Sequence, residues 1–350
     1  MITLKRRVLM ILLLLCLTIP LTSCAPKLHR YEAQFLELFD TVTKVVGYSK
    51  DEETFTSYVE TLRDKVKEYH ELYDIYNDYP GVNNIKTIND NAGIAPVKVD
   101  QRVIDLIKFA VDQCRLTDGQ VNIAMGAVLS IWHDYRETGM EDPEHARLPS
   151  MEELQAAAQH ADINDIVIDE AASTVFLSDP LMSLDVGAVA KGYACERVAE
   201  QMQAQGFDHA LFSLGGNVRA IGAKDAKGGP FSTGIEDPNG TAENPFVRIV
   251  NLTDASLVTS GNYERYYTVD GKRYHHLIDP DTLFPAEFFT SITILCRDSG
   301  LADALSTAIY NMPYDEGRAY VDSLDGVEAL WLFPDGSVQY TDGFAKFIKE

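Results

Sequence analysis

Cysteine is scarce in this chain, with five residues among 350 and no CxxC pair. Cys16 and Cys24 lie in the N-terminal segment, which leaves Cys114, Cys195 and Cys296, an odd number with wide spacing. This usage argues against a disulfide framework and against a metal site made of cysteines. We expect the last three to behave as small apolar side chains.

Positive charge is also scarce. Lysine and arginine number 30 against 53 acidic residues, which gives a formal net charge of −23. Such a chain repels nucleic acid and anionic lipid headgroups, so nucleic-acid binding is excluded as a function. Apolar residues make up 46% of the sequence, enough for a substantial core, and we expect a globular protein.

The N-terminus lacks an apolar run long enough to span a membrane, because residues 8–17 are too few. Three basic residues precede this run, a pattern that predicts a cleaved export signal over residues 1–23. The sequence LTSC at 21–24 resembles a bacterial lipoprotein processing box. It implies acylation of Cys24, an anchor and tether over 24–34, and a place on the extracytoplasmic face of the cell membrane. The alternative is an ordinary cleaved signal with an incidental cysteine.

The stretch 183–222 carries two glycine clusters at the ends of predicted elements. Small or apolar residues recur at every fourth position, namely Ala190, Ala194, Val198 and Met202. This spacing predicts an amphipathic helix that ends near Gly206. Residues 209–214 are typical of a short buried strand, and the glycines at 215–216 tolerate positive φ before the next strand begins at Val218.

Patterns elsewhere predict further elements. The helices are expected over 55–72, 103–116 and 301–309, the strands over 41–48, 247–250 and 292–296, and the hairpins over 166–177 and 266–278. These elements do not alternate regularly, as a doubly wound fold requires. We therefore expect a single domain over 35–350 of the α+β (mixed α/β) class, with a mixed sheet, antiparallel hairpins and packed helices.

Lys191 falls in the first turn of the helix predicted to start near Ala190. A cation there opposes the helix dipole, at a cost of up to about 1 kcal/mol, unless an anionic ligand is present. This pattern indicates a phosphate-binding site, formed by backbone N–H groups, the lysine and the flanking Gly187 and Gly192. The alternative is that both glycines allow tight packing and that the lysine extends into water.

Several motifs, in order along the chain, resemble the ApbE family of flavin transferases. They are TDGQVNI (117–123), DVGAVAKGYA (185–194), SLGGN (213–217), TSGNYER (259–265), RYHHLIDP (273–280) and LADALSTA (301–308). Members of that family usually read DLGGIAKGYA followed by LGGN. The resemblance covers nearly all of the chain after about residue 30, and it implies an ApbE-like domain.

The resemblance implies a set of residues that contact the flavin nucleotide. A family tyrosine that stacks on the nucleotide matches Tyr76, for which the residues alone also allow an exposed turn aromatic. Gln120, Val121 and Asn122 stand where the family has Ala-Met-Asp or Ala-Phe-Asp against the cofactor. Asn122 keeps a hydrogen-bonding group there but lacks the charge of the acid.

The resemblance also implies a magnesium site. In the family the matching residues are Asp303, Thr307 and the backbone carbonyl of Ala188, and oxygen ligands with open positions for phosphate suit Mg²⁺. Asp185 is expected to bind or orient the cofactor, and Lys191 to neutralise its pyrophosphate. Taken alone, Asp303 is equally an ordinary solvated acid in the first turn of a helix.

His276 aligns with the histidine of the family's SHIIDP motif, which makes it the expected base for the acceptor hydroxyl. A histidine in a strand is otherwise more often a packed or surface residue. The chain departs from the family after Pro280, where Leu283 replaces a glycine of the usual xTGxP. If that glycine permits close approach of the backbone to the ligand, its loss changes cofactor affinity.

The resemblance implies transfer of the FMN moiety of FAD to a serine or threonine of an acceptor protein, with AMP as the leaving group. Implied acceptors are membrane redox pump subunits and exported flavoproteins that carry a Ser/Thr-Gly-Ala-Ser/Thr motif. Two alternatives stay open: hydrolysis of FAD to FMN and AMP, and a lipoprotein that holds flavin without chemistry. The sequence specifies neither the acceptor nor the oligomeric state.

Overall fold

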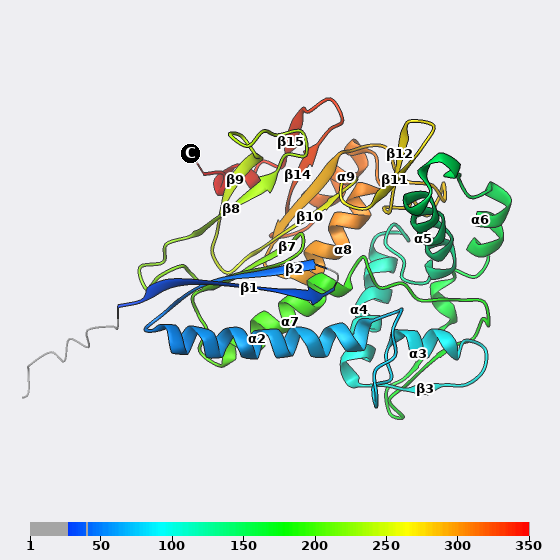
Figure 1. Ribbon diagram of the computed structural model, residues 1–350, viewed down its shortest axis with the longest axis horizontal. Coiled ribbons are helices and arrows are strands. Elements are labelled where there is room, and N and C mark those ends of the chain that lie inside the picture. The colour runs from blue at the N-terminus through cyan, green and yellow to red at the C-terminus, as the bar shows by residue number, and fades with distance from the viewer. Residues whose placement is uncertain (1–26, 40, 350) are drawn as a thin grey trace, which may run out of the picture.

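The computed structural model describes residues 27–39 and 41–349, and its centre is an eight-stranded sheet (Figure 1). In spatial order the strands are β1 (His29–Leu38), β2 (Thr41–Ser49), β6 (Ala210–Leu214), β7 (Asn217–Ile221), β10 (Ser256–Gly261), β13 (Ser291–Cys296), β14 (Glu328–Leu332) and β15 (Val338–Tyr340). All neighbouring pairs in this order are antiparallel.

The α+β class is therefore confirmed, but the main sheet is antiparallel rather than mixed. Short turns join β1 to β2, β6 to β7 and β14 to β15, and turns this short connect only antiparallel strands. The glycine loop between β6 and β7 is one of them: Gly215 adopts φ +64° there. The predicted strand boundary at Val218 is correct to within one residue.

Helices cover one face of the sheet. They are α2 (Glu52–Tyr73), α7 (Ala190–Ala204), α8 (Ser299–Tyr310) and α9 (Tyr314–Asp322). The predicted stripe of α7 is buried in the main core together with Leu62 of α2 and Leu305 of α8, and α7 ends before Gly206, which has φ +92°. The two helices that carry the strongest motifs, α7 and α8, thus lie side by side over the sheet (Figure 1).

The opposite face of the sheet is covered by the hairpin of β8 (Phe231–Glu236) and β9 (Phe246–Leu252) and by the C-terminal turn η3 (Phe344–Phe347). Phe231 and Phe344 pack there against Leu257 and Leu295 of the sheet in a second core cluster. Because both faces are covered, the central strand β13 is buried along its whole length.

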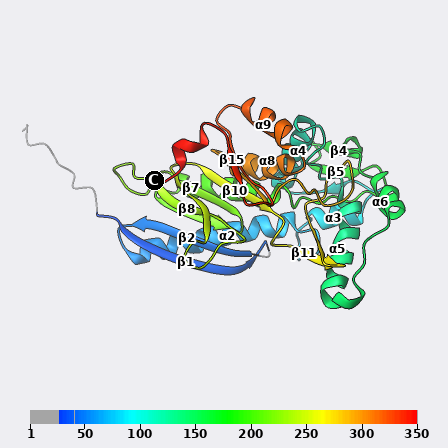
Figure 2. The ribbon, with the colours of Figure 1, turned by 90° about the horizontal axis from the view of Figure 1, so that it is seen from above.

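A separate layer of short elements lies beyond the end of the sheet (Figure 2). It contains the helices α3 (Ile85–Asp90), α4 (Gln101–Leu116), α5 (Gly126–Glu141) and α6 (Met151–Ala158), the turns η1 (Pro143–His145) and η2 (Ile163–Asp165), and a small sheet of β3 (Val97–Lys98), β5 (Thr174–Leu177) and β4 (Ile166–Asp169). The hairpin of β11 (Tyr266–Val269) and β12 (Lys272–His275) packs on α5. The hairpin predicted over 266–278 is confirmed, and Asp270 and Gly271, both with positive φ, form its two-residue turn.

The N-terminal predictions fall mostly outside the described residues. The export signal over 1–23 and the acylated Cys24 lie there. The predicted tether over 24–34 is too long, because β1 begins at His29 and pairs with β2 from that residue onward. Within the described residues, no helix has the length and apolar character to cross a membrane.

The prediction that the last three cysteines behave as small apolar side chains is confirmed. Cys114, Cys195 and Cys296 are all buried, and none of the three forms a disulfide. Burial raises the pKa of each thiol, that of Cys296 to about 12, so these side chains are not thiolates at neutral pH.

Candidate active site

One cavity of about 500 Å³ lies between the helical face of the sheet and the layer that contains α5 and the β11–β12 hairpin. Its walls come from the C-terminal end of α2, the start of α5, the loop into α7, the segment after β12 and one face of α8. Every residue predicted to contact cofactor or metal lines it: Tyr76, Gln120, Val121, Asn122, Asp185, Ala188, Lys191, His276, Asp303 and Thr307. Segments far apart in the sequence therefore meet at one place.

Asp303 of α8 caps the neighbouring helix α7. Its Oδ2 accepts a hydrogen bond of 2.7 Å from the backbone N–H of Gly192, in the first turn of α7, where no side chain of α7 supplies a cap. The side chain is only 4% exposed, which rules out the solvated surface acid that the sequence also allowed. Burial raises the pKa of Asp303, and nearby Lys191 and the Gly192 N–H partly offset this.

Asp303 supplies a hydrogen-bond partner that α7 itself lacks. Gly192 is in the first turn of α7, where backbone N–H groups have no partner within the helix. Ala188 comes two residues before α7 and lines the cavity. Thr307 lies one turn after Asp303 on α8 and faces the same cavity.

These three oxygens fit a hard divalent cation. The donor set is one buried carboxylate, one hydroxyl and one backbone carbonyl, the ligand type that magnesium accepts together with substrate phosphate. No group of three or more His, Cys, Asp or Glu side chains in the described residues is arranged to hold a metal ion. A cation at Asp303 therefore needs further oxygens from a bound ligand, as magnesium–nucleotide sites commonly do.

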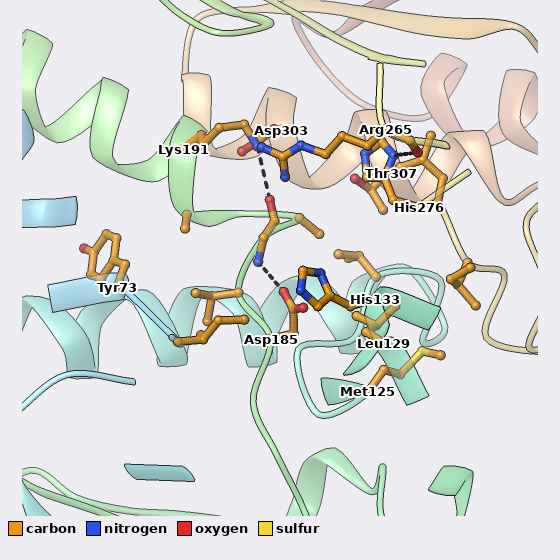
Figure 3. A pocket seen from close by; sticks show the side chains of 18 of the residues that line it. Tyr73, Met125, Leu129, His133, Asp185, Lys191, Arg265, His276, Asp303 and Thr307 are labelled. Carbon is orange, nitrogen blue, oxygen red and sulfur yellow. Dashed lines mark hydrogen bonds between the residues drawn. The ribbon is translucent and has the colours of Figure 1, made fainter. Parts of the chain in front are cut away.

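Positive groups gather in the cavity despite the acidic chain (Figure 3). Lys191, Arg136 and Arg265 all line it, and the Nζ of Lys191 donates to the carbonyl of Gly187 at 3.3 Å. Arg265 comes from the loop before β11 and Arg136 from α5, so three separate elements supply the charge. The arrangement suits an anionic ligand such as a pyrophosphate.

Asp185 is linked to Lys191 through Gly187 (Figure 3): the N–H of Gly187 donates to Asp185, and Lys191 donates to the carbonyl of Gly187. Its backbone N–H donates to the carbonyl of Ile123, and its Oδ1 accepts from the N–H of Gly187, so both the main chain and the side chain are fixed. Desolvation raises the pKa of Asp185 against the opposing effects of the Gly187 N–H and of Lys191. A carboxylate held in this way can orient a donor group of a ligand.

His276 is held as a neutral imidazole. Desolvation, followed by the positive charge of Arg265, lowers its pKa to about 3. Its Nδ1 lies 3.3 Å from the carbonyl oxygen of Arg265, which can only accept, so Nδ1 carries the proton and Nε2 is the free base. This tautomer makes His276 ready to take a proton from a hydroxyl group.

The preceding histidine, His275, has no ring nitrogen available to act as a base. His275 is 7% exposed, its Nε2 donates to the carbonyl of Ala286, and its Nδ1 accepts from the N–H of Leu277. Burial lowers its pKa to about 4. Both nitrogens are thus used by the backbone, and of the two adjacent histidines only His276 lines the cavity.

Tyr76 stands at the cavity mouth with 55% of its surface exposed. Its ring lies 5.4 Å from that of His133, at an interplanar angle of 33°. The turn that carries it is fixed by Asp74, which accepts hydrogen bonds from the backbone of Tyr76 and Asn77 and from the hydroxyl of Tyr79. An exposed ring on a rigid turn can stack on a planar ligand.

Asn122 lines the cavity, but its amide serves the backbone. Its Nδ2 donates to the carbonyl of Ala161 and its Oδ1 accepts from the N–H of Ala124. Asn122, which stands where the family has an acid, thus stabilises a local turn of the backbone. Gln120 and Val121 also line the wall, Val121 with a buried side chain.

Comparison with known proteins is consistent with this geometry. The model of the ApbE family matches residues 39–331. The chain belongs to the ApbE family. FAD:protein FMN transferase of Treponema pallidum is 34% identical over 278 residues, 76% of this chain and 75% of that protein. The enzyme of the same name from Klebsiella pneumoniae is 30% identical over 268 residues, 76% of this chain and 79% of that protein.

Solved structures support the ApbE fold. The crystal structure of the ApbE protein from Thermotoga maritima has a TM-score of 0.80 and 31% identity, and the match covers 92% of this chain and all of that one. The flavinyl transferase ApbE of Pseudomonas stutzeri has a TM-score of 0.75 at 22% identity, over 92% of this chain and 97% of that one. The architecture described above is therefore that of the family.

Leu283, which stands where the ApbE family has a glycine, has an unusual backbone conformation in this chain. Leu283 adopts φ +60°, a region that glycine enters without strain, and it is not among the residues that line the cavity. Its side chain is 8% exposed and packs in the cluster that contains Trp132 and Ile278, while its carbonyl accepts from Trp132 Nε1 at 2.9 Å. Leu283 therefore lies outside the cavity lining and contributes to the packing around Trp132.

Sequence reasoning missed several residues of the ApbE-family cavity, above all His133, Arg136, Arg265 and Asn311. The sequence could have identified Arg265, because this residue ends the TSGNYER motif. His133 and Arg136 lie one turn apart on α5, with Arg136 donating to His133 Nδ1 at 2.8 Å, but no local pattern shows which face of α5 meets the cavity. Asn311 follows Asp303 and Thr307 at intervals of four, the signal that could have revealed it.

Proposed function

We propose that this chain is an FAD:protein FMN transferase, which moves the FMN moiety of FAD to a serine or threonine hydroxyl of an acceptor protein. One observation carries the proposal: a neutral histidine, a lysine and a buried oxygen set converge in a single cavity. A base, a cation and a metal-ligand set are the components that phosphoryl transfer requires. Relatives with this name are 34% and 30% identical over about three quarters of the chain.

The acceptor hydroxyl oxygen forms a bond to the phosphorus of the FMN half, and its proton passes to Nε2 of His276. The bond from this phosphorus to the bridging oxygen breaks, and AMP leaves with that oxygen. Lys191 lines the cavity and can bind the pyrophosphate and the charge that develops on it, while Asp185, in the loop before α7, orients the ligand.

Magnesium fits the oxygen set described above, and we propose that Asp303, Thr307 and the carbonyl of Ala188 hold it. When bound, the ion supplies charge neutralisation on the phosphate oxygens. The buried Asp303 carboxylate supports this role, because burial has raised its pKa and a cation would stabilise its charged form.

The acceptor and the membrane anchor belong to the same proposal. We propose acceptors with a Ser/Thr-Gly-Ala-Ser/Thr motif, such as redox pump subunits or exported flavoproteins, and a mature chain that begins at acylated Cys24 on the extracytoplasmic face of the membrane. Substitution Cys24→Ser tests the anchor: labelled palmitate should enter the wild-type protein and not the variant. Incorporation of palmitate into both the wild-type protein and the variant would show that Cys24 is not the acylated residue.

The activity is tested by mass spectrometry of an acceptor domain incubated with FAD, Mg²⁺ and the full chain in detergent. The expected product is an FMN adduct on the acceptor hydroxyl, with AMP released and no adduct from the Asp303→Ala variant. Free FMN and AMP without an adduct would instead identify an FAD hydrolase. Bound FAD without any product would identify a flavin carrier and would overturn the enzyme assignment.

A further inference from the structure

A second cavity, of about 580 Å³, lies against the β11–β12 hairpin. Its walls come from β12, the loop before β11, the end of β8 and the segment 285–290. Consecutive residues divide between the two cavities: His276 lines the first and His275 the second. Arg265 and Glu264 divide in the same way. The two cavities therefore meet at the backbone that carries the proposed base.

One backbone edge of β12 pairs with no other strand in the described part of the chain, because β11 and β12 form a two-stranded sheet of their own (Figure 1). The N–H of His276 donates to the carbonyl of Arg265 at 3.1 Å, and hydrogen-bonded and non-hydrogen-bonded pairs alternate along an antiparallel ladder. Arg273 and His275 are therefore in non-hydrogen-bonded pairs, and their backbone N–H and carbonyl groups point away from β11. Both residues line the second cavity, so this free edge borders it.

The facing wall of the second cavity leaves this edge unpaired. After β12, the N–H of Ala286 donates to the carbonyl of Leu277 at 3.1 Å, which joins the segment 285–290 to the chain at that point. Along β12 itself, Arg273 and His275 form no backbone hydrogen bond to any described residue of that segment. Unpaired N–H and carbonyl groups on a strand edge are the groups to which an extended polypeptide binds as a further strand.

A strand added at this edge leads directly to the proposed base. Successive side chains of a strand lie on opposite faces, which agrees with the division of His275 and His276 between the two cavities. Residues directly opposite each other on paired strands have their side chains on the same face, with Cβ atoms about 4.5–5.5 Å apart. A serine or threonine opposite His276 would therefore direct its hydroxyl to the same face as the imidazole.

The second cavity also carries negative charge. Glu236 and Glu264 both line it, and burial, followed by the charges of these two carboxylates, raises the pKa of the Tyr263 hydroxyl between them and the wall. The nearby guanidinium of Arg273 lies over the ring of Tyr266, 4.6 Å from its centre. A basic side chain of a bound polypeptide would complement the two glutamates.

We propose that the free edge of β12 binds an extended segment of the acceptor protein as an added strand, and that Glu236 and Glu264 bind a basic side chain of this segment. The inference rests on the proposed function, which requires a polypeptide hydroxyl to reach His276. Strand addition uses backbone hydrogen bonds, which do not depend on the acceptor's side chains. One site can therefore accept several proteins that share only a short motif around the modified residue.

Hydrogen exchange tests the edge directly. The full chain in detergent is measured with FAD, with and without a saturating acceptor domain in which alanine replaces the modified residue of the Ser/Thr-Gly-Ala-Ser/Thr motif. We expect the amides of Arg273 and His275 to exchange about 10-fold more slowly in the complex. The amide of Thr268, which points outward from the opposite edge of the hairpin, should not change. Unchanged exchange at Arg273 and His275 would overturn the inference.

Arg273→Pro removes one N–H from the free edge and keeps the pairing with β11, because that N–H does not bond to β11. We expect the KM for an unmodified acceptor domain to rise about 10-fold, while the dissociation constant of FAD, from flavin fluorescence, changes less than about 2-fold. Thr268→Pro is the matched control, since it makes the same change on the other edge, and it should leave the KM unchanged. Arg273→Ala retains the N–H; an equal rise in KM in this variant would overturn strand addition.

The two glutamates are tested together. Glu236→Gln combined with Glu264→Gln should raise the acceptor KM by about 3-fold to 10-fold at low salt and reduce its dependence on salt concentration. A KM and a salt dependence equal to those of the wild type would remove the basic side chain from the proposal.

The outcomes separate the inference from the proposed function. If the acceptor receives FMN but neither Arg273→Pro nor amide exchange shows an effect, the docking edge is overturned while the transferase stands. If the acceptor protects Arg273 and His275 from exchange but no FMN adduct forms, the proposed function fails while the docking edge stands.

Discussion

The backbone N–H of Gly192 and the carboxylate of Asp303, 111 residues apart in sequence, form a 2.7 Å hydrogen bond that joins α7 to α8. This contact caps α7 and holds Asp303, one of the three proposed metal ligands, at the cavity wall. The glycine is required for the approach, because a Cβ at residue 192 would lie 2.4 Å from Asp303 Cβ and 2.2 Å from the carbonyl oxygen of Ser299.

Gly192→Ala should therefore destabilise the protein, although alanine favours a helix by about 1 kcal/mol over glycine. The clash with backbone and side chain forces α7 and α8 apart, and we expect a loss of about 1–3 kcal/mol in the free energy of unfolding, together with weaker Mg²⁺ dependence of activity. Denaturant unfolding measures the first effect. Gly317→Ala in α9 is the control, since its nearest contact is a methyl group at 3.1 Å, and it should be close to neutral.

Asp303→Asn should separate stability from activity. Burial raises the pKa of Asp303, so the charged form destabilises the native state above that pKa, and a neutral amide of the same shape removes this penalty. We expect a higher Tm without metal and a kcat about 10²–10³-fold lower. A lower Tm in the absence of Mg²⁺ would contradict this account of the site.

The pH dependence of kcat/KM tests the neutral His276. Its pKa near 3 keeps the imidazole unprotonated in the free protein, so kcat/KM should stay level as the pH falls from about 8 to about 5. An inflection near 6.5 that disappears in His276→Asn would show an unperturbed histidine instead. The variant itself should lose about 10²–10⁴-fold in kcat.

The same pKa predicts how stability changes with pH. Below 6.5 an unfolded chain protonates this histidine, whereas the native protein does not until the pH approaches about 3. The unfolded state thus binds more protons between these values, and the contribution of His276 to stability decreases as the pH falls through this window. The denaturation midpoint of His276→Asn should fall less steeply with acid than that of the wild type.

Leu283 can be tested by comparison of two substitutions. Leu283→Gly relieves a left-handed conformation that costs about 1–2 kcal/mol but removes a buried side chain worth about 2 kcal/mol. Leu283→Ala loses most of the burial and keeps the strain, so it should be the less stable of the two variants. Because Leu283 is outside the cavity lining, FAD affinity should change less than 3-fold in both, as equilibrium binding measures.

Local patterns made much of the architecture predictable. The stripe of α7 and the hairpin around Asp270 and Gly271 depend on neighbours close in sequence, and the structure has both. The motifs contain nine of the ten predicted residues that line one cavity, all except Tyr76, since each motif carries its own loop or helix end.

The sequence by itself determined several of the elements, the α+β class and the chemical types of the residues at the site. Only the tertiary structure decided that Asp303 caps α7, that the carbonyl of Arg265 fixes the tautomer of His276, and that Asn311 lines the cavity. The tertiary structure also decided the antiparallel pairing throughout the main sheet and the left-handed backbone conformation of Leu283. Burial and hydrogen-bond partners come from segments far apart in the chain, and a local pattern of residue types does not specify which of them will meet.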